Sequence, residues 1–229
     1  MKIAAGLLEA CAQNKVKTII IISSTTVYQP AYYPIREDEL DLNIPPYHSY
    51  VGVGWYNRYL EQLAGFYAKT YGMKAIIFRP TSLYGPYDKF DDTNSHVIPA
   101  LIKRALSKEV PFQVWGSPHV VRDFIYVEDF VDDIIYSFRH DDIPSSTPVN
   151  ICNGSPLSIG DAAMVILRVC GHDAKISFNA DKPSSIPYRA VDDTKYRCHF
   201  GHKKRTTFET GIKKTVDWYK KLIKREGDQ

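Results

Sequence analysis

The stretch TIIIISSTTVY, from Thr18 to Tyr28, decides the fold. Its first half, Thr18 to Ile22, is an unbroken β-branched and apolar run with the length of a buried strand. Its second half, Ser23 to Thr26, places a row of hydroxyl side chains where that strand would end. Ligands bind at the carboxyl ends of strands in open α/β sheets. These hydroxyls therefore either hydrogen-bond a ligand or only cap the strand and start a turn.

Helical and strand-like patterns alternate outward from this strand. Apolar residues at helical spacing occupy 1–14 and 49–71, and 75–78 reads as a second buried strand. The remaining segments predict helices over 96–106, 129–138, 158–171 and 208–225, and strands over 112–115, 124–127, 148–152 and 176–178. Helices that alternate with short apolar strands are typical of a doubly wound α/β sheet with parallel strands.

Composition excludes several classes of protein. With 229 residues, 44% hydrophobic and 24% charged, the chain is neither disordered, collagen-like nor coiled coil. A net charge of +3 is too small to indicate a nucleic-acid partner. The longest apolar run is far shorter than the roughly 20 residues that cross a membrane. We therefore expect a cytoplasmic protein without a membrane partner. Its four cysteines are widely spaced and form no C-x-x-C, which predicts reduced thiols and no metal site.

Tyr50 begins the helical pattern that follows the hydroxyl row, 26 positions after Ser24. A phenol has an ordinary pKa of about 10 and transfers protons poorly at neutral pH unless a nearby cation lowers that value. Taken alone, Tyr50 is one of 16 tyrosines, and a packing role stays open. The order of the surrounding segments adds information, because strand, Ser24, Pro-rich loop, Tyr50 helix and second strand lead into RPTSLYGP at 79–86.

In this order the chain resembles the extended short-chain dehydrogenase/reductase family, which contains nucleotide-sugar epimerases, dehydratases and reductases. The runs 82–90 and 94–101 are similar to the substrate loop of the GDP-L-fucose synthase branch. Further matches at 114–116, 122–129, 150–154 and 182–192 are shared across the wider family and support the fold more than the substrate.

The resemblance implies a doubly wound parallel, Rossmann-like sheet that is N-terminally truncated and carries a small C-terminal substrate lobe. We expect a partial Rossmann-like domain over 1–110, and a substrate lobe mixed with returning sheet elements over 111–229. The implied activity is NADP- or NAD-dependent epimerisation and reduction of a nucleotide sugar. The family's first strands and glycine-rich turn have no counterpart here. A homodimer or a complementing N-terminal half is the expected partner.

The resemblance also implies roles for individual residues. Ser24 would hold the keto oxygen of the sugar, Tyr50 would donate a proton to it, and His96 would act as acid and base in the epimerisation. Without the resemblance, a histidine such as His96 is more often a helix-start residue bonded to backbone than an acid or base. The implied cofactor-binding residues are Pro80, Thr81 and Ser82, and the implied substrate-binding residues are Asn94, Ser95, Arg104, Trp115, Arg122 and Arg189. As isolated residues, the arginines would be solvated charges.

Two departures from the family pattern support a rival hypothesis. The family has Tyr-x-x-x-Lys, whereas Gly54 stands at the lysine position here, which removes a positive charge from beside Tyr50. Arg58 lies about 12 Å further along an ideal helix, too far to replace it. The second departure is the missing glycine-rich turn. The sole G-x-G, at 52–54, lies inside the helical pattern and is a weak signal of dinucleotide binding. The rival is a non-catalytic nucleotide-sugar-binding or partner subunit that has lost the cofactor half.

Overall fold

The computed structural model describes residues 2–91, 95–140, 142–182, 185–201 and 204–227. Its centre is a parallel three-stranded sheet in the order β1 (Thr18–Ile22), β2 (Lys74–Pro80) and β7 (Pro148–Ile151). β1 has the bounds that the sequence predicts, and β2 is longer at both ends. The carboxyl ends of β1 and β2 therefore lie side by side, with Ile22 opposite Phe78.

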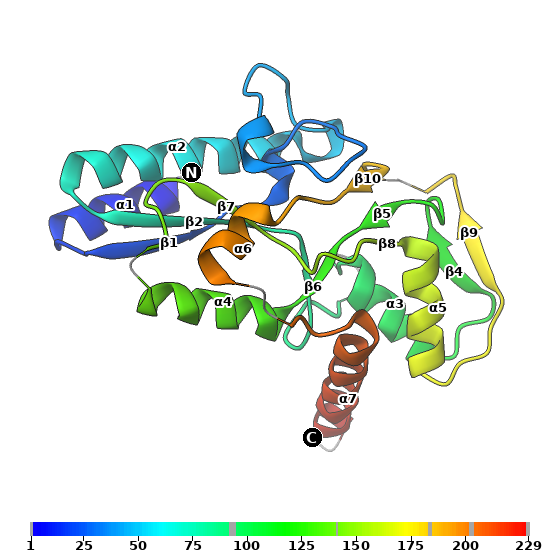
Figure 1. The fold of residues 1–229 in the computed structure, drawn as a ribbon. Coiled ribbons are helices and arrows are strands. Elements are labelled where there is room, and N and C mark those ends of the chain that lie inside the picture. The colour runs from blue at the N-terminus through cyan, green and yellow to red at the C-terminus, as the bar shows by residue number, and fades with distance from the viewer. Residues whose placement is uncertain (1, 92–94, 141, 183–184, 202–203, 228–229) are drawn as a thin grey trace.

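Helices cover both faces of this sheet (Figure 1). On one face lie α1 (Lys2–Gln13) and α2 (Val51–Tyr71), and on the other lie α4 (Val127–Arg139) and α6 (Thr194–Phe200). This arrangement of helices around parallel strands confirms the predicted doubly wound α/β fold. α6 was not predicted from the sequence.

The central sheet has an apolar core on each of its two faces. Successive side chains of a strand point to opposite faces. Ile21 of β1 and Ile77 of β2 accordingly pack in one core with Leu60 of α2. Phe78 packs in the other core, where its ring contacts Phe130 of α4. Burial on both faces explains why these strands read as continuous apolar runs.

A lobe with its own core lies beside the sheet. It contains α3 (Val97–Leu106), α5 (Ile159–Val169), α7 (Phe208–Gly227) and the parallel pair β4 (Phe112–Trp115) and β9 (Ile176–Asn179). The N-cap of α5 is Ser158, as predicted, and its hydroxyl accepts a hydrogen bond from the Asp161 N–H at 3.0 Å. The buried residues of the lobe include Ile102, Phe112, Val114, Ile166 and Ile212.

Short strands join the sheet to the lobe. β3 (Ser82–Tyr84) pairs with β6 (Phe124–Tyr126). β5 (Val121–Arg122) lies between β8 (Leu157–Ser158) and β10 (Tyr188–Arg189). β3, β5, β8 and β10 were not predicted, because two or three residues carry no periodic pattern. They matter for the site, since the pairing of β5 with β10 places Arg122 opposite Arg189.

A buried ion pair ties α2 to the end of β2. The Arg79 Nη2 atom lies 2.6 Å from Glu61 Oε2, and both side chains are almost completely buried. Glu61 Oε1 also accepts hydrogen bonds from Arg79 Nε and from the Ser23 hydroxyl. The Arg79 Nη1 atom donates to the Tyr28 hydroxyl, which donates to Asn150 on β7. Through its hydrogen bond to Glu61, the network holds Ser23, the residue immediately before Ser24.

Short 3₁₀ segments carry the chain from the sheet to α2. η1 (Thr25–Val27) is separated from β1 by two residues, η2 (Glu37–Glu39) lies in the Pro-rich segment, and η3 (His48–Tyr50) precedes α2. Tyr50 thus stands at the N-cap of α2 rather than inside the helix.

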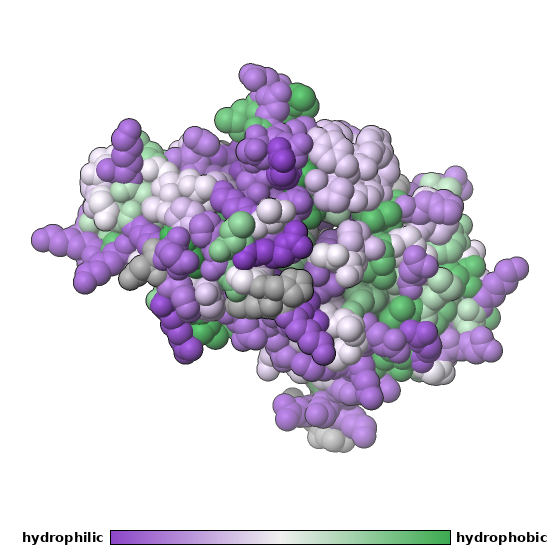
Figure 2. Space-filling view, in the orientation of Figure 1, coloured by the Kyte–Doolittle hydropathy of each residue, from purple (hydrophilic) through white to green (hydrophobic). Residues whose placement is uncertain are grey.

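Hydrophilic residues cover most of the face in Figure 2, and hydrophobic residues gather mainly over the lobe around α5 and β9. Within the described part of the chain, none of the helices combines the length and the apolar character that a membrane crossing requires.

Candidate functional site

A main cavity of about 930 Å³ opens where the carboxyl ends of β1 and β2 face the lobe. It brings together almost all the residues that the sequence nominated, from elements far apart in the chain. Asn94 lies outside the described residues. The nominated residues that line the cavity are Ser24, Tyr50, Pro80, Thr81, Ser82, Ser95, His96, Arg104, Trp115, Arg122 and Arg189.

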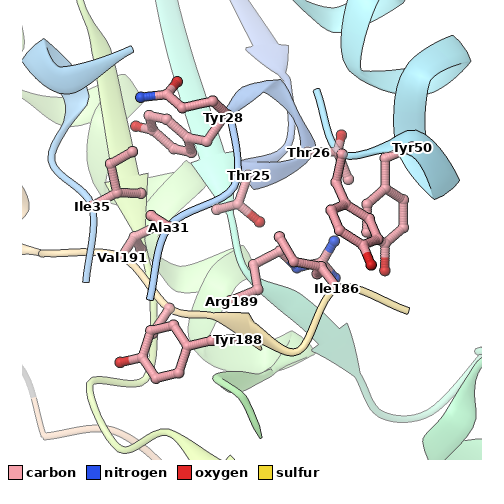
Figure 3. A pocket seen from close by; sticks show the side chains of 13 residues that line it. Thr25, Thr26, Tyr28, Ala31, Ile35, Tyr50, Ile186, Tyr188, Arg189 and Val191 are labelled. Carbon is pink, nitrogen blue, oxygen red and sulfur yellow. The ribbon is translucent and has the colours of Figure 1, made fainter. Parts of the chain in front are cut away.

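A second, small cavity of about 20 Å³ adjoins the first at Thr26, Tyr50 and Arg189, which line both (Figure 3). In Figure 3 the Arg189 side chain extends toward Tyr50. The centre of its guanidinium lies 4.8 Å from the centroid of the Tyr50 ring, a cation–π contact. The Tyr50 hydroxyl also makes a short contact with the Ser185 hydroxyl.

The surroundings of Tyr50 lower the pKa of its phenol. Burial alone would raise that pKa, because it disfavours the charged phenolate. The positive charge of Arg189, the hydrogen bond with Ser185 and the charge of Arg122 act in the opposite direction and together outweigh burial. Tyr50 therefore stands in an environment that favours proton transfer.

Arg122 and Arg189 are two cations that face the same cavity without a carboxylate between them. Neither forms an ion pair within the described ranges. Burial and the neighbouring Arg189 lower the pKa of Arg122 to about 10, and the Tyr50 phenol partly offsets this effect. The buried Nη1 atom of Arg189 has no hydrogen-bond partner of normal geometry among the described residues, while Nη2 donates to the Ser82 hydroxyl at 3.3 Å. Such a pair is suited to hold an anion.

Ser24 and Thr81 use their hydroxyl groups locally. The Ser24 hydroxyl accepts a hydrogen bond from the Thr26 N–H at 3.1 Å and caps η1. The Thr81 hydroxyl donates to Asp123, a buried carboxylate that also accepts three backbone N–H groups from 153–155. Ser24 thus caps the turn that follows the strand, and it also lines the cavity, where its contact with a ligand stays a prediction.

Trp115 and Arg104 form a cation and aromatic pair on the lobe side of the main cavity. The Arg104 guanidinium lies 5.6 Å and the Lys182 ammonium 5.3 Å from the centroid of the Trp115 ring. Trp115 is 52% exposed, so its indole is accessible for stacking. Arg104 also lies 3.8 Å from the Glu109 carboxylate, and its charge is therefore partly compensated.

His96 precedes α3 and pairs with a carboxylate that sequence reasoning missed. Its Nδ1 atom lies 2.9 Å from Asp88 Oδ1. The hydrogen bond to Asp88 and the charge of this carboxylate raise the pKa of His96 above its ordinary value, against a smaller opposing effect of burial. The imidazole lies at the cavity wall with its protonated form favoured, as an acid and base near neutral pH requires.

Changing Asp88 to asparagine is expected to lower the pKa of His96, because the carboxylate that favours the imidazolium is removed. In the wild-type protein the ion pair exists below the raised pKa and is lost as pH rises through it. An NMR titration of the His96 ring in both proteins measures the change. Asp132→Asn, which removes an exposed carboxylate from α4, should leave the His96 titration in place. An unchanged pKa in Asp88→Asn would contradict the pairing.

Comparisons with known proteins show the family of the chain. Residues 1–152 match the model of the NAD dependent epimerase/dehydratase family. A GDP-L-fucose synthase from Sinorhizobium fredii is 31% identical over 225 residues, which cover 93% of this chain and 68% of the relative. The chain belongs to the NAD dependent epimerase/dehydratase family. This confirms the membership that the sequence motifs predicted.

Other members of the epimerase/dehydratase family are similar over comparable lengths. The GDP-L-fucose synthase of Escherichia coli is 29% identical over 238 residues, which cover 96% of this chain and 71% of that protein. The solved GDP-L-fucose synthetase of Naegleria fowleri bound to NADP has a TM-score of 0.84 and 26% identity, and the match covers 96% of this chain and 71% of that structure. This chain thus spans about seven-tenths of each of these two relatives.

Gly54 is the point where this epimerase/dehydratase chain departs most clearly from the expected pattern. A Cβ atom at position 54 would lie 2.6 Å from the Pro46 side chain and 2.6 Å from the Thr26 carbonyl oxygen. The space for a side chain is therefore filled by the Pro-rich segment. Arg58 offers no replacement, because its guanidinium donates to the carbonyl oxygens of Val27 and Ile44.

Sequence reasoning missed several groups that shape the site. Asp88 and Ser185 lie inside the matched runs 82–90 and 182–192, but neither was nominated, since each reaches the site only through a contact made in the folded chain. Asp123 stood inside a matched motif, but its neighbour Arg122 was the nominated residue. No cluster of three or more potential metal-ligating side chains occurs among the residues described by the structure.

Proposed function

We propose that the chain is a nucleotide-sugar epimerase/reductase of the GDP-L-fucose synthase type. The observation that carries this proposal is the pair Arg122 and Arg189, which lack a carboxylate partner in the described part of the chain and share one cavity with Tyr50 and His96. Two guanidinium groups side by side suit the diphosphate of a nucleotide sugar, because each can donate two hydrogen bonds to phosphate oxygens. The similarity to GDP-L-fucose synthases supports the same assignment.

The remaining substrate groups fit the lobe side of the main cavity. Arg104 and the accessible Trp115 ring would contact the nucleotide or the sugar, and Ser95 would contact the sugar. The volume of about 930 Å³ is within the range of small-ligand sites. A single elongated ligand could therefore reach from Trp115 to Tyr50.

Proton transfer would be carried out by Tyr50, Ser24 and His96. The Ser24 hydroxyl would hold the keto oxygen, and the Tyr50 phenol would donate a proton to that oxygen as it is reduced. His96 would take a proton from carbon when its imidazole is neutral and return one to carbon when it is protonated, the form that Asp88 favours. Before the diphosphate binds, the arginines near Tyr50 lower the pKa of its phenol.

The residues present fit a nicotinamide cofactor only in part. Pro80, Thr81 and Ser82 line the cavity at the end of β2, beside Ser24, where they would flank a nicotinamide ring. The hydride for reduction would come from that cofactor, NADP or NAD, when it is bound. The sequence contains no G-x-G-x-x-G turn to seat its phosphates. The packing around Gly54 also excludes a lysine that would hold the ribose.

Because the residues present fit the cofactor only in part, we also propose a second candidate function, that of a non-catalytic nucleotide-sugar-binding or partner subunit. The specific observation in its favour is the filled space at Gly54. In either case we propose a homodimer or a complementing polypeptide as partner. Exposed apolar side chains on α1 and α2, among them Leu7, Trp55 and Phe66, support such an assembly.

A thermal-shift experiment with GDP and a GDP-sugar tests the substrate site. At a ligand concentration 100 times the dissociation constant, stabilisation of about 2.7 kcal/mol is expected. For a domain of this size, this corresponds to a rise in Tm of about 5–10 °C. The Arg122→Gln variant should lose most of the rise. The Arg168→Gln variant, altered at an exposed arginine of α5, should keep it.

The same experiment separates the two candidate functions. No shift with any nucleoside-diphosphate sugar at millimolar concentration would contradict both. A nucleotide-sugar shift accompanied by micromolar binding of NADPH in a calorimetric titration would favour the enzyme. A nucleotide-sugar shift without cofactor binding would favour the binding subunit.

A further inference from the structure

The phenol of Tyr50 faces positive charge from strands β5 and β10 instead of from its own helix. Position 54, one turn along α2, is a glycine packed against Pro46 and the Thr26 carbonyl, so no cation can enter there. On the opposite side, the Arg189 guanidinium lies over the Tyr50 ring at 4.8 Å. Strand pairing fixes this arrangement, because β10 places Arg189 in register with Arg122 on β5.

The two arginines in turn need a negative partner. Their positive charges repel each other across the pair of strands β5 and β10. In addition, Arg189 Nη1 is buried without a hydrogen-bond partner among the described residues. The groups that face Tyr50 from the packed elements are Arg122, Arg189 and the Ser185 hydroxyl, with Tyr47 nearby in the preceding turn. None of these is a carboxylate. Among these groups, the phenol is therefore the one that can supply a negative charge when the cavity holds no anion.

We propose that Arg189, assisted by Arg122, is the positioning residue that supplies positive charge to the Tyr50 phenol, and that an anion held by the same arginines withdraws this charge. The second part rests on the proposed diphosphate site. In the empty cavity the arginines favour the phenolate. A bound diphosphate neutralises them and shifts the equilibrium of Tyr50 toward its protonated form, which is the form that can donate a proton.

The sign of the coupling follows from linkage. Whatever raises the pKa of Tyr50 on binding must itself bind more weakly where Tyr50 is already ionised. GDP affinity is therefore expected to fall as pH rises through the pKa that Tyr50 has in the free protein. Replacing Tyr50 with phenylalanine should remove this component of the pH dependence.

NMR of the full chain labelled with ¹³Cζ-tyrosine tests the proposal directly. Tyr50→Phe assigns the Tyr50 signal, and its titration is then followed in the wild-type protein, Arg189→Gln and Arg189→Lys. We expect the Tyr50 pKa to lie below that of an ordinary tyrosine, to rise in Arg189→Gln and to stay low in Arg189→Lys. Arg104→Gln is the matched control, because it removes an arginine from the Trp115 side of the cavity and should leave the Tyr50 titration in place.

The outcomes distinguish this proposal from the proposed function. A Tyr50 pKa at or above the ordinary value, or one unchanged in Arg189→Gln, would overturn the role of Arg189 whether or not GDP binds. If Arg189→Gln does not fold, Arg122→Gln replaces it, with a smaller rise expected. GDP binding without any rise in the Tyr50 pKa would overturn the coupling alone. Absence of GDP binding would overturn the diphosphate site and the coupling, while the titration still decides the role of Arg189.

Discussion

Replacing Glu61 with leucine is expected to lower the free energy of unfolding by about 3–5 kcal/mol, because it leaves the Arg79 charge buried and unpaired. The Arg79 side chain is only 3% exposed, so water cannot solvate the freed guanidinium without opening the core. The Ser23 hydroxyl loses its acceptor in the same variant. Urea unfolding monitored by tryptophan fluorescence and circular dichroism measures the loss.

A surface pair provides the matched control for this prediction. Arg168 on α5 and Glu209 on α7 lie 2.8 Å apart, but both side chains are more than half exposed. Glu209→Leu should therefore cost less than about 1 kcal/mol. The double variant Glu61→Leu with Arg79→Met should recover much of the loss, because it removes both buried charges. A cost for Glu61→Leu no greater than that of Glu209→Leu would contradict the buried network.

The sheet could be predicted from the sequence because burial dictates its residues. β1 is apolar on both faces, since α2 covers Ile21 and the other core receives Ile20. The amphipathic pattern of α2 follows from the same packing, with Leu60 and Ala64 buried against the sheet. Such elements carry their own signal, and their bounds were predicted to within a few residues.

The surroundings of the site could not be predicted in the same way. Arg122 and Arg189 were nominated through the family resemblance, yet their neighbourhood depends on the two-residue strands β5 and β10, which have no pattern of their own. Their contact with Tyr50 joins residues more than 70 positions apart in the chain, and neither spacing nor composition encodes it. In the sequence Tyr50 lacks the cation of the family pattern, whereas the folded chain supplies one from Arg189.

The role of Gly54 could not be predicted from the sequence either, because it depends on which segments pack against this position. From the sequence, glycine at this position is a lost lysine, and restoring the cation would be expected to improve Tyr50. In the structure, the space is occupied by Pro46 from the loop before α2 and by the carbonyl of Thr26 from η1. The glycine is therefore adapted to a close approach of three segments.

Changing Gly54 to alanine is accordingly expected to destabilise the protein by about 1–3 kcal/mol, the usual cost of an overpacked core. Helix propensity alone predicts the opposite, since alanine is favoured over glycine in a helix by about 0.5–1 kcal/mol. Gly52 is the matched control in the same helix, because a Cβ atom there meets nothing within 4 Å. Gly52→Ala should therefore stabilise the protein, and urea unfolding of the two variants should give changes of opposite sign.

Gly54→Lys should be still more destabilising, because its longer side chain must displace Pro46 and Thr26 from beside the cavity. The displaced Thr26 would disturb the cap that Ser24 provides to η1, so the variant should also weaken nucleotide-sugar binding. The ¹³Cζ signal of Tyr50 then reports whether the new ammonium reaches the phenol. A stable Gly54→Lys protein with a further lowered Tyr50 pKa would contradict this account, because it would show that the Pro-rich segment yields and that a lysine can be accommodated beside the Tyr50 phenol.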